Sequence, residues 1–264
     1  MANKEIYEHF HPDERPFVDR ATEWVERSAE RHEVRRTDFL DPRQLYILET
    51  IANRNPDVRL RTDGGYPEAE RKRALIAPDY RSLEDEPAGI VVLSVSAGGT
   101  GGTATAELDH GDYLGALLGL GVKRDRIGDI HVREDGSHCL VAEEIADYLN
   151  IHLRQVHRVH VTTEILPLDA LVPVVPKLEE LALTVASMRL DGIASDVFRV
   201  SRSKITDPIK VGRCRVNWKT EEEPSKPLKA GDVVSFKGLG RFKVLDVEGV
   251  TKKGRIRVRI GRFV

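Results

Sequence analysis

The segment VSAGGTGGTATAELDHGDYLGALLGLG (residues 95–121) decides between two folds for the middle of this chain. Gly99, Gly101 and Ala104 have the spacing of a dinucleotide-binding loop, which needs a helix N-terminus directly at the glycines to offer free N–H groups to phosphate. The residues that follow, TATAELD, instead alternate between small or apolar and polar side chains, which predicts a strand. The glycines are therefore expected to close a β-hairpin, where positive φ angles are needed.

The helix after this hairpin is expected only at DHGDYLGALLGLGV, with Asp109 or His110 near its cap. That start is roughly ten residues too late for a dinucleotide fingerprint. No acidic residue closes a following strand at the distance that a ribose contact requires. The pattern therefore argues against a nucleotide-binding α/β domain.

Outward from this segment, residues 88–170 predict a small α+β domain. Strands are expected at GDIHVRED, HCLVAEE and HRVHVTTEIL, with a second helix at EEIADYLNIHLRQV. The order β-β-α-β-β-α-β predicts an antiparallel sheet with helices on one face, a sandwich reminiscent of RNA-recognition folds. Because the strands lack the aromatic residues that stack bases in such folds, we expect this sheet to act as a scaffold.

Residues 1–87 predict a mostly helical N-terminal domain. Apolar residues recur at steps of three and four in RPFVDRATEWVERSAERHEV, which indicates an amphipathic helix. A second helix is expected at DPRQLYILETIANRNP, with Asp41 as N-cap and Pro42 in the first turn. A short strand, a Gly-Gly turn and a charged element follow. The fold class is thus α+β, in three small domains over residues 1–87, 88–170 and 181–264.

The charge of the chain is distributed unevenly. The net charge of −2 combines +10 over residues 181–264, from 19 basic and 9 acidic side chains, with −12 over the preceding 180 residues. A basic segment on an acidic body is typical of a polyanion-binding module on a carrier, since phosphate contacts release condensed counterions. A solvated charged surface is the simpler alternative.

The basic segment contains a pattern suited to phosphate. A helix is expected from Arg189 to about Phe198, and Ser201 is expected to cap a second short helix with cations in its first turn. RCRVNW and DVVSFKG read as strands whose basic residues would share one face with that turn. The predicted RNA-binding residues are Arg189, Arg199, Ser201, Arg202, Ser203, Lys204, Lys210, Arg213, Arg215, Asn217, Lys219 and Lys237.

The motifs RLD (189–191), SRSK (201–204), VGRCRVN (211–217) and LKAGDVV (228–234) resemble the alpha-L RNA-binding domain of the ribosomal protein S-four type. The resemblance spans about residues 181–245, with Pro208 as a departure that would kink or end the second helix. The same module precedes catalytic domains in pseudouridine synthases. However, Asp191 lies at the start of the module's own first helix, so we interpret it as a structural carboxylate.

Further segments resemble the YlmH-like family of bacterial RNA-binding proteins, and this resemblance covers the whole chain. The segments are FLDP (39–42), GGYPEAERKRALIAP (64–78), LDHGDYLGALLGLGVKRDRIGDI (108–130), VNWK (216–219) and GVTKKGRIRV (249–258). That resemblance implies a protein without known catalysis that binds rRNA and, nearby, tRNA. It also implies association with the large ribosomal subunit during rescue of stalled translation, and links to cell division.

Cofactors and metals are not expected. Cys139 and Cys214 have no metal-type spacing and suggest no disulfide framework, which fits a reducing cytoplasm. His152 and His157 lie five apart on an expected helix, and with His160 they lack a completing ligand. The N-terminus has no apolar signal region, and no uncharged stretch approaches the roughly 20 residues of a membrane span, so a soluble cytoplasmic protein is expected.

Alternatives remain open at this point. TKKGRIRVRIGRF is either a second RNA surface or an edge strand defended by charge. GVKRDRIGDI is an RNA contact, a protein contact or a solvated loop. The protein as a whole could be an adaptor for division or rescue factors with secondary RNA binding, or an RNA-modifying enzyme whose catalytic domain the sequence does not reveal.

Overall fold

A computed structural model describes residues 7–97 and 108–263. The predicted Gly-rich hairpin, with most of the TATAELD strand, lies outside these residues. The chain divides into two compact units. The N-terminal unit is Pro12–Val174, and the C-terminal unit is Val175–Val264 together with Met1–His11.

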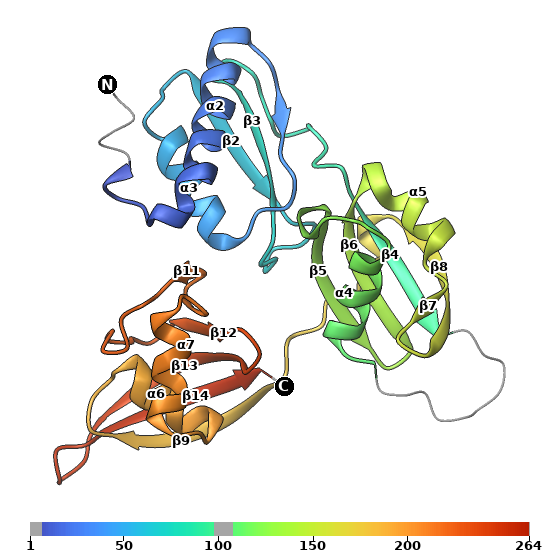
Figure 1. The fold of residues 1–264 in the computed structure, drawn as a ribbon. Helices are drawn as coiled ribbons and strands as arrows, with labels where there is room; N and C mark the ends of the chain where they lie inside the picture. The colour runs from blue at the N-terminus through green and yellow to red at the C-terminus, as the bar shows by residue number, and fades with distance from the viewer. Residues whose placement is uncertain (1–6, 98–107, 264) are drawn as a thin grey trace. The chain divides into compact units, whose positions relative to one another are not determined.

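The N-terminal unit begins with two helices that lie against a three-stranded antiparallel sheet (Figure 1). A short 3-10 turn, η1 (Pro12–Glu14), leads into helix α2 (Arg15–Arg31). After β1 (Arg35–Arg36), helix α3 (Pro42–Ala52) precedes β2 (Val58–Asp63) and β3 (Arg73–Pro78), and the strand order is β1-β3-β2.

The local chemistry of these helices matches the sequence prediction. Asp41 caps α3 by accepting a hydrogen bond from the Gln44 backbone N–H, while the Gln44 side chain accepts one from the Asp41 N–H. Helix α2 buries its apolar stripe, including Phe17, Val18 and Trp24. The sequence predicted a charged element after the Gly-Gly turn. The structure instead has strand β3 there, with all six of its residues buried. The region is therefore mixed α and β, not mostly helical.

The second sheet of the N-terminal unit has the strand order β5-β6-β4-β8-β7, with every neighbouring pair antiparallel. Its elements, with the short turns η2 and η3, run along the chain as β4 (Ile90–Ala97), α4 (His110–Gly119), η2 (Arg124–Arg126), β5 (Ile127–Arg133), β6 (Gly136–Ala142), α5 (Glu143–His152), β7 (Gln155–Val156), β8 (Val159–Leu166) and η3 (Leu168–Ala170). Asp109 caps α4, which confirms the predicted late helix start.

One face of this second sheet is covered by helices, and the other is covered along β6 and the start of β4. On one face, Leu93 and Val95 of β4 pack with Leu117 of α4 and Leu149 of α5. On the other face, residues of β4 and β6 pack against the beginning of the N-terminal unit, in a core of Phe39, Leu75, Ala77, Leu83, Ala88, Ile90, Val92, Leu140 and Ala142. The second face is packed closely, because a Cβ atom on Gly128 would lie only 2.7 Å from the Phe39 ring.

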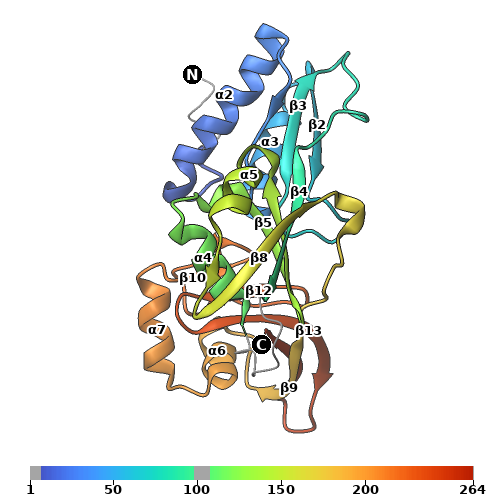
Figure 2. The same ribbon diagram turned by 90° about the vertical axis from the view of Figure 1, so that its right-hand side faces the viewer.

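The C-terminal unit is a six-stranded antiparallel sheet with two helices on one face (Figures 1 and 2). Along the sheet the order is β11-β10-β12-β13-β14-β9. The elements are β9 (Leu178–Val185), α6 (Leu190–Phe198), α7 (Arg202–Lys210), β10 (Cys214–Val216), β11 (Lys219–Thr220), β12 (Val233–Phe236), β13 (Gly240–Val250) and β14 (Ile256–Phe263).

Two expectations for this unit change. Strand β14 was one candidate for a charge-protected edge, but it lies between β13 and β9, so that interpretation was wrong. Helix α7 continues through Pro208 to Lys210, even though proline removes one backbone donor. The first strand of the sheet starts at Leu178, three residues before the basic segment that the charge count defines.

Each unit contains one cysteine, and both thiols are free and buried. Cys139 lies in β6 and Cys214 in β10. Burial raises the pKa of each thiol to about 12. The thiols are therefore protonated and shielded in the folded protein.

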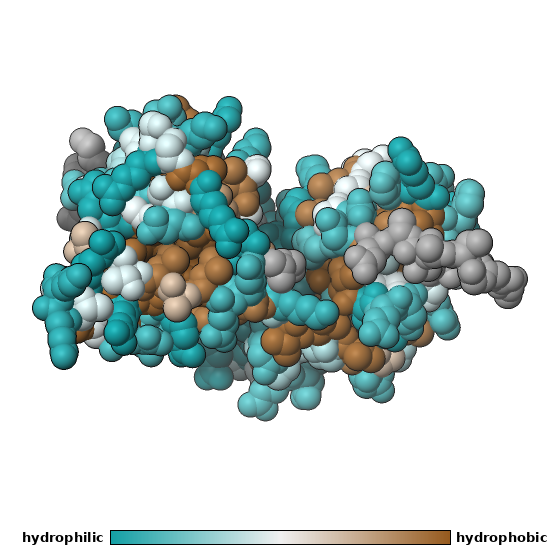
Figure 3. Space-filling model, turned by 90° about the horizontal axis from the view of Figure 1, so that it is seen from below, coloured by the Kyte–Doolittle hydropathy of each residue, from teal (hydrophilic) through white to brown (hydrophobic). Residues whose placement is uncertain are grey.

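Seen from below, hydrophilic side chains surround smaller apolar areas (Figure 3). Within residues 7–97 and 108–263, no helix combines the length and the apolar composition needed to cross a membrane.

Candidate nucleic-acid interface

The start of helix α7 has the composition of an anion-binding site. Ser201 is its N-cap, as predicted, and its side chain makes no capping bond to the helix. The Ser201 and Ser203 hydroxyl oxygens lie 3.0 Å apart, and Arg202, Ser203 and Lys204 are all exposed. Uncapped N–H groups, the positive helix end and two cations therefore coincide, without an acidic residue in the first turn.

The turn between α6 and α7 places further groups beside this site. Arg199 ends α6 in a left-handed conformation with φ of 53°, and its N–H donates to the Ser195 carbonyl oxygen. The Ser195 hydroxyl donates to the Val200 carbonyl oxygen over 2.6 Å, which fixes the turn. The Arg202 guanidinium lies over Gly192 of α6, where a Cβ atom would be 2.9 Å from its Nη2. Glycine at this position thus leaves room for Arg202.

Arg189 is paired with Asp191. Its guanidinium makes two hydrogen bonds to the Asp191 carboxylate, of 3.1 and 3.0 Å, and Asp191 also accepts from the Gly192 N–H. The side chain of Asp191 is only 9% exposed, against 44% for Arg189. The hydrogen bond from Arg189 lowers the pKa of Asp191 although burial opposes the shift. Asp191 is thus a structural carboxylate, and Arg189 is the counterion that satisfies it.

The Asn217 side chain also makes hydrogen bonds within the protein. Its amide nitrogen donates to Asp232 over 2.8 Å, and its amide oxygen accepts from the Val233 N–H over 2.9 Å. These bonds tie the β10–β11 turn to the start of β12. The side chain that sequence reasoning assigned to RNA therefore stabilises the sheet in this conformation.

The predicted cations on the strands do not share one face. Cys214 and Val216 of β10 are buried against the helices, so the intervening Arg215 lies on the opposite, helix-free face. The Lys237 N–H donates to the Arg213 carbonyl, which continues the β10–β12 ladder beyond its last assigned pair. Lys219 pairs with Val216 and so lies on the helix side. The expected single face was wrong, because the helices cover the face of Cys214 and Val216, which leaves Arg215 on one side of the sheet and Lys219 on the other.

Lys210 and Lys219 lie beside acidic residues. They border one shallow pocket of the C-terminal unit together with His11, Thr220, Glu221, Glu222, Glu223 and Pro224. The three glutamates reduce the positive potential there, so these two lysines are weaker candidates for phosphate contact than the start of α7. Apart from Arg189, the predicted cations are exposed and form no ion pair with any residue that the structure describes.

Sequence reasoning missed Arg241 and Lys243 in β13. They alternate with the buried Phe242 and Val244 and pair with Ser235 and Val233 of β12, which puts them on the helix-free face with Arg215. The alternating segment RFKV (241–244) carries the same signal as the arginines of the last strand, so it could have been found.

The basic loop of the middle segment serves internal contacts. Arg124 donates to the carbonyl oxygens of Ile127 and Gly128, and burial lowers its pKa to about 10. Arg126 pairs with Asp38 at 3.1 Å. Of the cations in this loop, Lys123 is left exposed.

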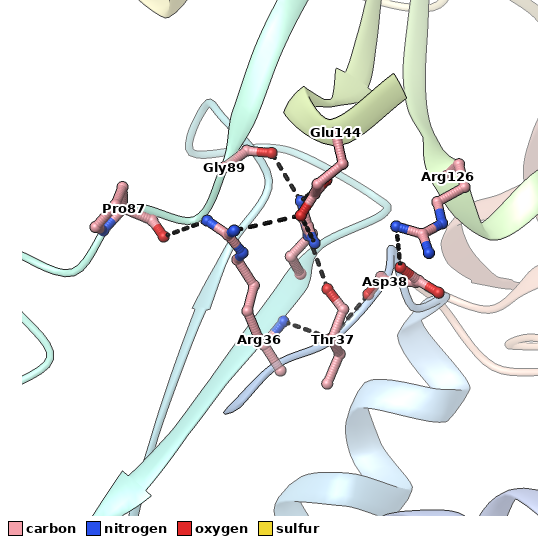
Figure 4. Close-up of polar contacts among 9 residues, drawn as sticks. Arg36, Thr37, Asp38, Pro87, Gly89, Arg126 and Glu144 are labelled. Atoms are coloured by element: carbon pink, nitrogen blue, oxygen red, sulfur yellow. Dashed lines mark hydrogen bonds and ion pairs between the residues drawn. The ribbon is translucent and has the colours of Figure 1, made fainter. Parts of the chain in front are cut away.

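An ionic cluster around the buried Arg73 of the N-terminal unit has a structural role (Figure 4). Arg73 makes two hydrogen bonds of 3.0 Å to Glu144 and donates to the carbonyl oxygens of Thr37 and Gly89, both at 2.7 Å. Arg36 approaches the same carboxylate at 3.3 Å. Burial opposes ionisation of Glu144, but its arginine partners hold its pKa below the ordinary value. These contacts connect the first sheet of the unit to helix α5 and to the chain just before β4.

The histidines do not form a metal site as arranged. His152 is the last residue of α5 and stacks on Tyr148, and His157 lies in a turn with φ of 50°, not on the helix as expected. In the parts of the chain that the structure describes, no three His, Cys, Asp or Glu side chains converge on a common point.

Comparison with known proteins places the sequence among its relatives. Residues 13–81 match the family described as "YlmH, N-terminal", and residues 102–170 match "Putative RNA-binding domain in YlmH". Ribosome-associated protein quality control protein P2 of Bacillus subtilis (strain 168) is 38% identical over 259 residues, 98% of each chain. The solved structure of cell division protein ylmH from Streptococcus pneumoniae has a TM-score of 0.53 and 23% identity, covering 61% of this chain and 95% of that one.

Proposed function

The chain belongs to the YlmH family, and on that premise we propose that it is an RNA-binding protein that associates with the ribosome in translation quality control. The name of the Bacillus subtilis relative, which matches over nearly the whole of both chains, supports this proposal. The finer proposal is that it docks on structured rRNA of the large subunit with tRNA nearby, and is coupled to cell division.

The observation that carries the proposal is the uncapped, cationic start of α7. Backbone N–H groups and flexible cations at a helix N-terminus suit phosphate oxygens, and the net charge of +10 over residues 181–264 attracts a polyanion. Phosphate contacts position a protein without reading sequence, so specificity would come from RNA shape. The helix-turn-helix of α6 and α7 followed by β10 supports an alpha-L domain within residues 181–264.

The middle segment, proposed as a separate domain over residues 88–170, would contribute differently. In an RNA-recognition fold, bases stack on the sheet face, but here the part of that face formed by β6 and the start of β4 packs against Phe39, Leu75 and Ala77. Any RNA contact of this segment would therefore use the exposed β8 side of the sheet, its helices or its loops.

A non-catalytic role is part of the proposal. Asp191, the residue that a modification enzyme would need in the RLD motif, is buried and paired with Arg189. A carboxylate held in this way is poorly placed to act as a nucleophile. Mass analysis of rRNA from a deletion strain would contradict this part if a specific modified base disappeared.

The first test is co-sedimentation of the protein with ribosomal subunits over a salt series. With about five ionic contacts, the slope of log K against log salt is expected to be about −3.5 to −4.5. The double variant Arg202→Glu, Lys204→Glu is expected to bind at least about tenfold more weakly and to flatten the slope by about 1.4–1.8, because two phosphate contacts are lost.

The matched control reverses two exposed arginines of the N-terminal unit, Arg54→Glu and Arg59→Glu. This variant changes the net charge equally and is expected to co-sediment like the wild type. A salt slope near zero, or equal losses in both double variants, would contradict an RNA anchor at α7.

A further inference from the structure

The helix-free face of the C-terminal sheet combines cations with aromatic rings. Arg215 of β10 pairs with Ser235 of β12, which pairs in turn with Arg241 of β13, so these side chains share this face. Lys243 of β13 pairs with Val233 of β12 and lies on the same face. Arg257 and Arg259 of β14 alternate with the buried Val258 and Ile260 and so lie on the same face. Although Glu180 and Glu248 pair with Arg259, the part nearest β10 is cationic.

Two aromatic residues flank Arg241 on this face. The guanidinium carbon lies 5.5 Å from the centroid of the Trp218 ring and 4.8 Å from that of Phe263. Both rings are half-buried, so each keeps part of its surface toward solvent. The Arg241 guanidinium thus lies over both rings, and the three side chains form one cation–π cluster, which we call the Trp218 platform.

The backbone of Trp218 is unusual. Asn217 and Trp218 form the two-residue turn between β10 and β11, with φ angles of 51° and 64°. Such a turn ordinarily has the sequence Asn-Gly, because the second residue needs a positive φ. A tryptophan in this conformation is strained, and strain of this kind concentrates at binding sites. Asn217, bonded to Asp232 and Val233, holds the turn in place.

We propose that the Trp218 platform stacks an unpaired base of RNA, while Arg215 and Lys243 contact the adjoining phosphates. This rests on the proposed RNA-binding function and adds a second contact, on the opposite sheet face from α7. Aromatic rings beside cations are how proteins bind single-stranded nucleic acid without reading its sequence. The same composition would attract an acidic peptide less well, since a peptide carboxylate has no extended ring to stack.

Trp218→Gly is the decisive variant, because glycine suits the left-handed turn and the sheet is expected to stay folded. Binding of the full-length wild type and variant to dye-labelled single-stranded oligoadenylate and to a labelled duplex of equal length is measured by fluorescence anisotropy, and tryptophan fluorescence is followed in parallel. The variant keeps only Trp24, which is buried in the N-terminal unit, and so supplies the background signal.

The wild type is expected to show quenching by the single strand. Trp218→Gly is expected to bind the single strand roughly 5- to 150-fold more weakly with an unchanged salt slope, and to bind the duplex within about twofold of wild type. Trp218→Phe is expected to recover part of the loss. An unchanged melting temperature, or a higher one, in Trp218→Gly would confirm that the fold is intact.

The outcomes separate the two proposals. If Trp218→Gly binds the single strand like wild type while Arg202→Glu, Lys204→Glu does not, the platform is not a base site and RNA binding at α7 stands. If polyglutamate quenches Trp218 as strongly as oligoadenylate, the platform is a general polyanion or peptide surface and base stacking is overturned. If wild type binds no RNA, both proposals fail.

Discussion

The two larger sheets of this chain differ in what covers them. The sheet of the N-terminal unit has helices on one face and Phe39, Leu75 and Ala77 on the other, so β6 is buried along its full length. The sheet of the C-terminal unit has helices on one face and exposed arginines on the other. The β6 side of the first sheet therefore has no free face, which teaches that a sheet of this element order need not offer bases a stacking surface.

The largest effect on stability is expected from removing the Phe39 side chain, which packs against the sheet of the N-terminal unit. Phe39→Ala removes a fully buried ring from between the two sheets of the N-terminal unit and is expected to lower the free energy of unfolding by about 3–5 kcal/mol. Urea denaturation measures the loss, and hydrogen exchange assigns it to the N-terminal unit. Tyr46→Ala, at a residue 54% exposed, is the control and is expected to cost less than about 1 kcal/mol. Comparable losses of unfolding free energy in the two variants would contradict the packing of Phe39 against this sheet.

A smaller effect is expected at the ionic cluster around Arg73. Glu144→Gln leaves Arg73, whose side chain is 2% exposed, without its counterion. The free energy of unfolding is expected to fall by about 2–3 kcal/mol, less than for a fully buried pair because Glu144 is 40% exposed.

The pH dependence sharpens that test. Because the folded pKa of Glu144 is lowered, its contribution is present above its unfolded pKa of about 4.3 and is lost as the pH falls through the folded pKa. The gap between wild type and Glu144→Gln in urea denaturation is therefore expected to narrow in acid. A gap that stays constant from pH 7 to pH 3 would mean that the charge of Glu144 is not what stabilises Arg73.

The smallest effect is expected in the C-terminal unit, from Asp191→Asn. The variant weakens the bonds to Arg189 and the Gly192 N–H and is expected to cost about 1–2 kcal/mol. Since the pKa of Asp191 is lowered in the folded protein, this contribution is also lost as the pH falls below about 3.9. Hydrogen exchange should place the change in α6. A change confined to the N-terminal unit would show that Asp191 does not stabilise its own helix.

Local features were predictable from the sequence. The caps at Asp41, Asp109 and Ser201 depend on a few neighbouring residues, and the structure has each helix start where the prediction put it. The order of strands was not predictable in this way. Strand β9 pairs with β14 from the far end of the basic segment, and no local pattern encodes such a distant partner.

The site was predictable only in part, for the same reason. The cations at the start of α7 are exposed as expected, because a helix cap and its first turn are local. Asn217 and Arg189 were assigned to RNA, and the structure adds that each also bonds an acidic partner, Asp232 or Asp191, which no local pattern indicates. Residue type indicates what a side chain can bind, whereas the tertiary fold decides whether it is still available.

The two buried thiols allow the opening rates of the two units to be measured separately. A thiol reagent can modify Cys139 only when the N-terminal unit opens, and Cys214 only when the C-terminal unit opens, since each pKa of about 12 leaves almost no thiolate at neutral pH. The labelling rates of Cys139→Ser and Cys214→Ser proteins would therefore report the opening of each unit separately. RNA that binds only the C-terminal unit would slow labelling of Cys214 and leave the rate at Cys139 unchanged.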